Sequence, residues 1–174
     1  MNDIAAQMKR CYGHEILSDS EEHTLRIGEL MARHAFSGLV VLLEGDLGTG
    51  KTTLVRGYCR AEGFSGVRSP SFTLVNRYVC GKKTVVHSDL YRLHSVDPTE
   101  LDMESYLDEE CVLFVEWADR GMPGDFEDIW RICIRYEDEY DDQGRRALSF
   151  SARGPRAESA LEGLLNDLEE MTSE

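Results

Sequence analysis

An eight-residue segment at positions 45–52 (GDLGTGKT) constrains this chain more than any other part of its sequence. It matches the pattern G-x-x-x-x-G-K-[ST], follows an apolar run of strand length at 39–43 and precedes a segment of helical periodicity. Its glycines permit a tight turn whose successive backbone N–H groups point at a phosphate chain. We therefore predict a nucleotide-phosphate site in a strand–loop–helix unit. The alternative is a glycine-rich turn without a ligand.

The residue types within this loop predict distinct roles. Lys51 would neutralise the β- and γ-phosphates, and the hydroxyl of Thr52 would ligate Mg²⁺. The helix that follows would present its N-terminal dipole and free N–H groups to the anion. The predicted nucleotide contacts from this segment are Asp46, Leu47, Gly48, Thr49, Gly50, Lys51, Thr52 and Thr53.

Two carboxylates stand at the ends of predicted strands. The apolar run 111–116 (CVLFVE) is typical of a fully buried strand in the same sheet as 39–43, and it ends in Glu116. A glutamate there can hold Mg²⁺ directly or through water and can orient the attacking water. Asp89 follows the apolar part of another strand and could reach the metal or that water. For Glu116 the alternative is an acid in solvent at a strand end.

The remaining pattern predicts an α/β fold of the P-loop NTPase type, a three-layer sandwich with a mostly parallel central sheet, some antiparallel strands and helices on both faces. We expect a single domain over 1–174, with a core at about 11–153. The expected elements are a strand at 11–17, a helix from a capping box at 18–21 to about His34, a phosphate-loop helix ending near Gly63, a strand starting at Phe72 and Leu74, a hairpin at 79–86, a helix at 97–107, strands at 129–136 and 147–152, and a C-terminal helix at about 155–170.

Hydroxyl side chains follow the phosphate-loop helix at Ser69, Ser71 and Thr73. A segment at this place in nucleotide switches senses the γ-phosphate. From the residues alone, a surface turn without contact to the nucleotide is an equally good interpretation of this segment.

Charge and cysteine content exclude several classes. With 33 acidic and 19 basic residues the net charge is −14, which repels nucleic acid, so we expect no DNA binding. Direct RNA binding would need a local basic patch. Six arginines could form it, or they could instead line the nucleotide or pair with neighbouring acids: Arg131, Arg135, Arg145, Arg146, Arg153 and Arg156. The five cysteines form no C-x-x-C pair, and no apolar segment approaches the roughly 18 residues of a membrane span. We therefore expect a cytoplasmic protein without membrane association.

Four motifs together resemble one family. GDLGTGKTT at 45–53, SPSFTLV at 69–75, HSDLYRL at 87–93 and VEW at 115–117, in this order, are similar to those of the bacterial TsaE (YjeE) family, the ATPase of the tRNA threonylcarbamoyladenosine pathway. The resemblance covers about residues 15–150. It differs at Ser71 and Ser88, where the family usually has Thr and an aromatic residue, and the tail after about residue 153 has no motif to match.

The resemblance implies an ATP-hydrolysing partner of the TsaB and TsaD proteins, which supports threonylcarbamoyl transfer to adenosine 37 of tRNAs and meets tRNA only through the complex. By the same resemblance, Lys51 contacts the phosphates, Thr52 and Glu116 hold Mg²⁺, and Asp89 assists hydrolysis. The 69–75 segment would respond to the nucleotide, with Trp117 beside the site.

Two further positions follow from the resemblance alone. Glu21, before the first helix, and Arg146, in the Gly144–Arg145–Arg146 turn, resemble residues that flank the adenine.

Other functional classes share a phosphate loop. A small-molecule kinase should show an arginine-rich lid, and a GTP-dependent regulatory switch needs N-K-x-D, which this sequence lacks. A nucleotide-binding scaffold that barely hydrolyses is a third class. Because no arginine finger is placed by the sequence, we expect slow turnover by the protein alone.

Overall fold

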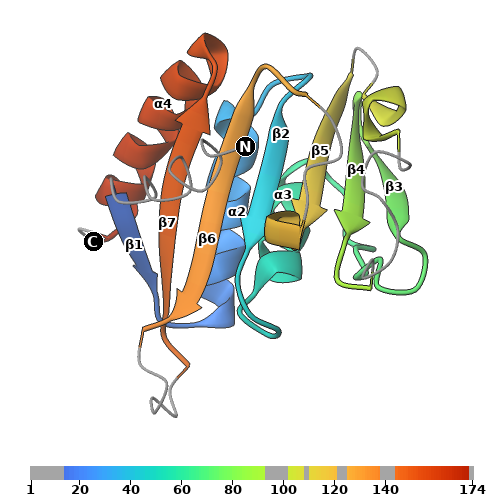
Figure 1. Ribbon diagram of the computed structural model, residues 1–174. Helices are drawn as coiled ribbons and strands as arrows, with labels where there is room; N and C mark the ends of the chain where they lie inside the picture. The colour runs from blue at the N-terminus through green and yellow to red at the C-terminus, as the bar shows by residue number, and fades with distance from the viewer. Residues whose placement is uncertain (1–13, 93–101, 108–109, 121–124, 138–143, 173–174) are drawn as a thin grey trace, which may run out of the picture.

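A single mixed sheet of seven strands organises the computed structural model, which describes residues 14–92, 102–107, 110–120, 125–137 and 144–172 (Figure 1). The strand order is β1-β7-β6-β2-β5-β4-β3. The strands are β1 (His14–Ser18), β2 (Val40–Glu44), β3 (Val75–Cys80), β4 (Lys83–Asp89), β5 (Cys111–Glu116), β6 (Ile129–Tyr136) and β7 (Arg146–Arg153). β6, β2, β5 and β4 pair in parallel, while β1, β7 and β3 pair antiparallel to their neighbours. The α/β fold class is confirmed.

The central strands β2 and β5 are buried at every position. Their near-continuous apolar sequences suit parallel strands that are covered on both faces. Alternate side chains enter two cores. Val41 and Phe114 belong to the larger core, whereas Leu42 and Leu113 belong to the smaller one.

Helices α2 (Glu21–His34), α3 (Lys51–Ala61) and α4 (Pro155–Thr172) all contribute to the larger core, on one face of the sheet (Figure 1). In the described chain, the other face is covered by the short 3₁₀ helices η3 (Met103–Tyr106) and η4 (Ala118–Arg120) and by Phe126. Within the described residues, the α-helices are therefore distributed more one-sidedly than expected from the sequence.

Two glycines allow α2 and α3 to pack very closely. A Cβ on Gly57 would lie 2.1 Å from the carbonyl oxygen of Leu25, and one on Gly28 would lie 2.3 Å from that of Leu54. Both neighbours are backbone atoms, which cannot move aside as a side chain can. This contact fixes α3, whose first residue is Lys51 of the phosphate loop.

Most predicted boundaries are confirmed, including the end of α2 at His34, the β3–β4 hairpin and the C-terminal helix α4. Gly63 has the left-handed conformation expected after α3 (φ 86°). The first helix is capped by Ser20, not from Ser18 as the capping-box pattern predicted. Ser18 is instead the buried last residue of β1, and its hydroxyl lies 2.7 Å from that of Thr24.

Two other expectations were partly wrong. The strand predicted from Phe72 and Leu74 starts at Val75, because 71–73 form a turn and Leu74 has a φ of 66°. Of the helix predicted at 97–107, positions 97–101 lie outside the described residues, and 103–106 form only the 3₁₀ helix η3. The strand expected at 11–17 is described from His14 onward. Among the described residues, no helix is long and apolar enough to cross a membrane.

Candidate functional site

The parallel strands β2, β4 and β5 end at one edge of the sheet, each in an acidic residue. Asp89 is the register partner of Glu116, and Leu43 is paired with Glu116 from the other side. Because side chains alternate along a strand, Asp89 and Glu116 lie on the face covered by α3. Glu44 lies on the opposite face, where it accepts a 2.5 Å hydrogen bond from Arg131. Ligands of open α/β sheets bind at this carboxyl edge.

The phosphate loop leaves β2 and enters α3 with glycine conformations. Gly45, Gly48 and Gly50 have φ of 139°, 80° and 110°. A Cβ on Gly45 would lie 2.2 Å from the carbonyl oxygen of Ile134, so only glycine fits there. Gly50 precedes the helix and offers no side chain to cap it. The first amides of α3 are therefore available to an anion.

Lys51 is almost fully buried within the loop. Its Nζ donates to the carbonyl oxygens of Gly45 (2.6 Å) and Asp46 (2.8 Å) and lies 4.2 Å from the ring centroid of Trp117. Burial lowers the pKa of Lys51, and the carboxylates of Glu116 and Asp89 oppose that shift. The ammonium group is held where a phosphate oxygen could replace the carbonyls.

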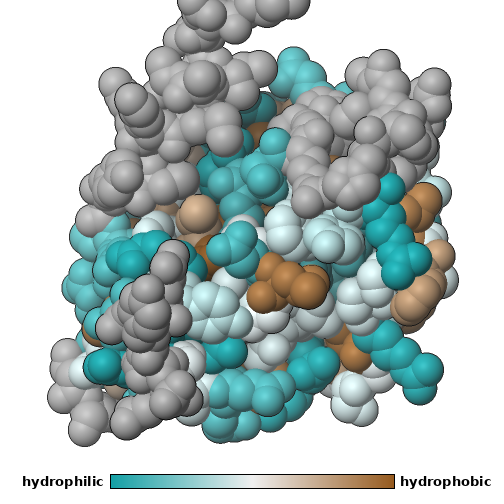
Figure 2. Space-filling model, turned by 60° about the horizontal axis from the view of Figure 1, so that its bottom comes forward, coloured by the Kyte–Doolittle hydropathy of each residue, from teal (hydrophilic) through white to brown (hydrophobic). Residues whose placement is uncertain are grey.

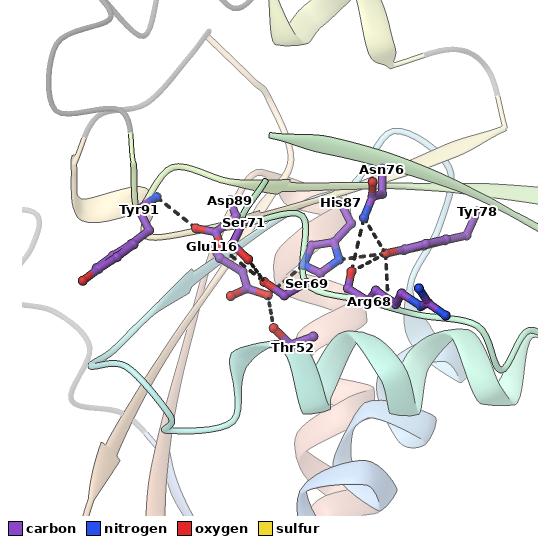
Figure 3. A network of polar contacts seen from close by, with 10 residues as sticks. All are labelled: Thr52, Arg68, Ser69, Ser71, Asn76, Tyr78, His87, Asp89, Tyr91 and Glu116. Carbon is purple, nitrogen blue, oxygen red and sulfur yellow. Dashed lines mark hydrogen bonds and ion pairs between the residues drawn. The ribbon is translucent and has the colours of Figure 1, made fainter. Parts of the chain in front are cut away.

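Glu116 connects the loop helix to the sheet. The hydroxyl of Thr52 donates a 2.7 Å hydrogen bond to Glu116 Oε1, and Nε2 of His87 lies 2.7 Å from the same oxygen (Figure 3). The result is a hydroxyl and a carboxylate side by side at the N-terminus of α3. Hard cations such as Mg²⁺ prefer oxygen donors of these two kinds.

Asp89 is held by the backbone that follows β4 and by a hydroxyl of the segment after the phosphate helix. Its Oδ1 accepts a hydrogen bond from the amide of Tyr91 (2.9 Å), and its Oδ2 accepts one from the hydroxyl of Ser69 (3.4 Å) (Figure 3). Burial raises the pKa of Asp89; the bond from Tyr91 opposes the shift and the charge of Glu116 adds to it. A carboxylate in this state is a good proton acceptor.

A cavity of about 400 Å³ opens between the phosphate loop and the 69–72 segment. It is lined by Lys51, Thr52, Asp89 and Glu116 together with the Trp117 ring. Figure 2 views the molecule from this end, where the surface is largely hydrophilic with small, separate apolar patches.

Apolar groups stand at the cavity as well. Phe72 is 83% exposed, and the Arg92 guanidinium lies 4.4 Å from its ring centroid. Leu47 of the phosphate loop is also exposed, and all three side chains line the cavity.

The predicted loop residues divide into two groups. Leu47, Gly48, Gly50 and Thr53 line the cavity with Lys51 and Thr52. Asp46 and Thr49 shape the loop instead, because the hydroxyl of Thr49 donates to the carbonyl oxygen of Asp46 (2.9 Å).

The two positions predicted to flank the base are separate from the cavity lining. Arg146 lies beside the phosphate loop, with Nη2 3.5 Å from the carbonyl oxygen of Gly48 and Nη1 2.6 Å from that of Gly144. Its Nε is buried without a hydrogen-bond partner in the described chain. Glu21, in the first turn of α2, forms an ion pair with Arg56 of α3 (3.1 Å).

The other arginines considered as an RNA patch have acidic, backbone or aromatic partners. Arg131 pairs with Glu44 and Arg135 with Glu15. The other contacts are Arg145 to Glu137, Arg153 to the carbonyl oxygen of Phe126, and Arg156 over the ring of Phe36. Pairing with an acid, one of the possibilities considered from the sequence, is what the structure shows for Arg131, Arg135, Arg145 and Arg153.

Sequence reasoning missed His87 and Tyr78. The His87 side chain is fully buried between Glu116 and the Tyr78 hydroxyl. The strand period of two could have identified His87, because it precedes Asp89 by two residues and so shares its face. Tyr78 carried no signal of this kind.

Known proteins resemble the chain over most of its length. The sequence model of the family described as "Threonylcarbamoyl adenosine biosynthesis protein TsaE" matches residues 18–147. A protein named tRNA threonylcarbamoyladenosine biosynthesis protein TsaE from Bacillus subtilis is 35% identical over 147 residues, which are 82% of this chain and 88% of the relative. A protein of the same name from Aquifex aeolicus is 40% identical over 64% of this chain and 81% of its own length. Another from a Nostoc species is 36% identical over 72% of this chain and 80% of its own length.

A solved structure shares the fold. The crystal structure of YdiB from Bacillus subtilis superposes with a TM-score of 0.71 at 29% sequence identity. The match covers 88% of this chain and 95% of that one.

Proposed function

Because the chain belongs to the TsaE family and so has a role in tRNA threonylcarbamoyladenosine biosynthesis, we propose that its cavity binds ATP with Mg²⁺ and hydrolyses it. The observation that carries this proposal is the 2.7 Å hydrogen bond from Thr52 to Glu116, next to the buried Lys51. A hydroxyl, a carboxylate and an ammonium at the start of one helix are the groups that P-loop NTPases use for a magnesium-bound triphosphate.

The oxygen donors of Thr52 and Glu116 suit magnesium better than a metal whose ligands all come from the protein. Among the described residues no group of three His, Cys, Asp or Glu side chains could hold a metal ion. Mg²⁺ usually takes only one or two protein ligands and fills its octahedron with phosphate oxygens and water. Thr52 and Glu116 would hold it, and it would neutralise charge on the β- and γ-phosphates.

The protein's own groups supply the other parts of hydrolysis. Lys51 and the first amides of α3 stabilise charge that develops on the γ-phosphoryl oxygens. Asp89 orients the attacking water and accepts its proton, as its raised pKa favours. Turnover by the protein alone is slow, because the sequence places no arginine finger at the phosphates and a partner completes the site.

Family membership supports the finer biological role. The protein acts with TsaB and TsaD in the cytoplasm, and its hydrolysis supports repeated threonylcarbamoyl transfer to adenosine 37 of tRNAs. It meets tRNA through that complex, since the net charge of −14 disfavours direct binding.

Calorimetric titration of the purified protein tests the nucleotide assignment. ATP should bind more tightly with Mg²⁺ than with EDTA, and GTP should bind more weakly than ATP. Phosphate release should then be measured with and without TsaB and TsaD, and stimulation by the pair is expected. Failure to bind ATP under both conditions overturns the proposal, and ATP consumption driven by a small acceptor would identify a kinase instead.

A further inference from the structure

A fully buried histidine lies directly behind the proposed magnesium ligand. Nε2 of His87 is 2.7 Å from Glu116 Oε1, and its Nδ1 is 3.4 Å from the Tyr78 hydroxyl (Figure 3). A carboxylate oxygen can only accept, so the ring donates to Glu116. From its place on β4, the ring is therefore hydrogen-bonded to Glu116 of β5 and packs against Tyr78 of β3.

This contact restrains the carboxylate. Oε1 of Glu116 accepts from both Thr52 and His87, which leaves Oε2 outside this pair of hydrogen bonds. Strand pairing fixes the histidine itself, because His87 is the register partner of Phe114 on one side and Asn76 on the other. A group held this firmly can set the rotation of the carboxylate that it contacts.

Tyr78 continues the connection to residues 68–76, which comprise the loop before β3 and the first two residues of that strand and which we term the hydroxyl loop. The Tyr78 hydroxyl donates to the carbonyl oxygen of Arg68 (2.7 Å) and accepts from the side-chain amide of Asn76 (3.3 Å). Arg68 and Asn76 are the two ends of the hydroxyl loop. Ser69 of the same loop donates to Asp89. The loop is thus hydrogen-bonded to Asp89 directly, and Tyr78 holds it beside the His87 ring that contacts Glu116.

We infer that His87 is a positioning residue that orients Glu116 for Mg²⁺ and packs against Tyr78, whose hydroxyl holds the hydroxyl loop. This inference rests on the proposed function. In this role His87 affects how tightly magnesium-bound ATP binds. It does not affect the binding of ATP without the metal, because His87 is not among the residues that line the cavity.

Two substitutions separate the two sides of the ring. In His87→Gln the side-chain amide nitrogen extends as far as Nε2 and can still donate to Glu116. In His87→Asn it extends only as far as Nδ1, so the contact with Glu116 is lost. Tyr78→Phe is the matched control, because it keeps the contact between His87 and Glu116 and removes the link to the loop.

Calorimetry gives the Kd of ATP for each protein in EDTA and in Mg²⁺. We expect His87→Asn to weaken binding in Mg²⁺ by roughly 10- to 100-fold, the usual effect of removing a residue that orients a metal ligand, with little change in EDTA. His87→Gln and Tyr78→Phe should keep the magnesium effect. Hydrogen exchange of amides in the hydroxyl loop should become faster in Tyr78→Phe. The ratio of the two Kd values within one variant is insensitive to a partly unfolded sample, because the unfolded fraction weakens both equally.

A spectroscopic measurement on the wild-type protein tests the inference without any substitution. The ring N–H resonance of His87 should shift when Mg²⁺ is added to the ATP-loaded protein. An unchanged resonance overturns the inference, as does a His87→Asn variant that keeps the wild-type ratio of Kd values or loses affinity equally in both buffers. A wild-type protein whose ATP affinity ignores Mg²⁺ overturns the proposed function, which is a different result from these.

Discussion

Asp89 and Glu116 occupy directly paired positions on the neighbouring parallel strands β4 and β5. The pairing places both carboxylates on the α3 face of the sheet, beside the start of that helix. They nevertheless have different partners, because Glu116 accepts from Thr52 and His87 whereas Asp89 accepts from Tyr91 and Ser69. Two carboxylates in different surroundings can take different roles at one site.

The Asp89→Asn variant should lose turnover while it keeps ATP binding. An amide cannot accept the proton of the attacking water, so the rate of phosphate release should fall by roughly 10²- to 10⁴-fold. Calorimetry and a phosphate-release assay on the same sample measure the two quantities. Equal rates for the Asp89→Asn variant and the wild-type protein would exclude Asp89 as the base.

The same substitution should change the dependence of stability on pH. Since burial raises the pKa of Asp89, the folded state holds this proton more tightly than the unfolded state does. The stabilisation of the folded wild-type protein by the protonated Asp89 is therefore fully present below the ordinary pKa of an aspartate. It is lost as the pH rises through the raised pKa of Asp89 in the folded state. Urea unfolding should show Asp89→Asn to be more stable than wild type near pH 7, with the difference shrinking as the pH falls toward 3 to 4, about the ordinary range for aspartate. A constant difference across this range would contradict the assignment.

Substitutions at Thr52 should separate magnesium binding from phosphate binding. Thr52→Ala removes the hydroxyl that donates to Glu116, so the gain in ATP affinity on adding Mg²⁺ should decrease by about tenfold or more. Thr52→Ser keeps a hydroxyl and serves as the matched control. If the alanine variant keeps the full magnesium effect, the hydroxyl is not a ligand.

The contact between α2 and α3 predicts a stability effect away from the site. Gly57→Ala would place a Cβ 2.1 Å from the carbonyl oxygen of Leu25 and should destabilise the protein by roughly 1–3 kcal/mol. Arg60→Ala, on the same helix, breaks surface ion pairs with Glu22 and Glu29 and should destabilise the protein less than Gly57→Ala does. Urea unfolding measures both. A Gly57→Ala variant as stable as Arg60→Ala would show that the helices can separate without cost.

The sequence by itself determined the local features of this protein. The glycines and Lys51 of the phosphate loop, the buried strand ending in Glu116 and the strand period of the hairpin all act within a few residues, so their consequences can be read from neighbouring positions. The α/β class followed from these features, and the motif combination identified the family.

Only the tertiary structure decided the relationships across the sheet. The cap at Ser20, the turn that delays β3 to Val75, and the helices gathered on one face depend on packing between distant segments. So does the position of His87, since its partners Glu116 and Tyr78 reach it only through strand pairing on both sides. A linear sequence carries the pattern of each strand, but the order of strands in the sheet sets which side chains meet.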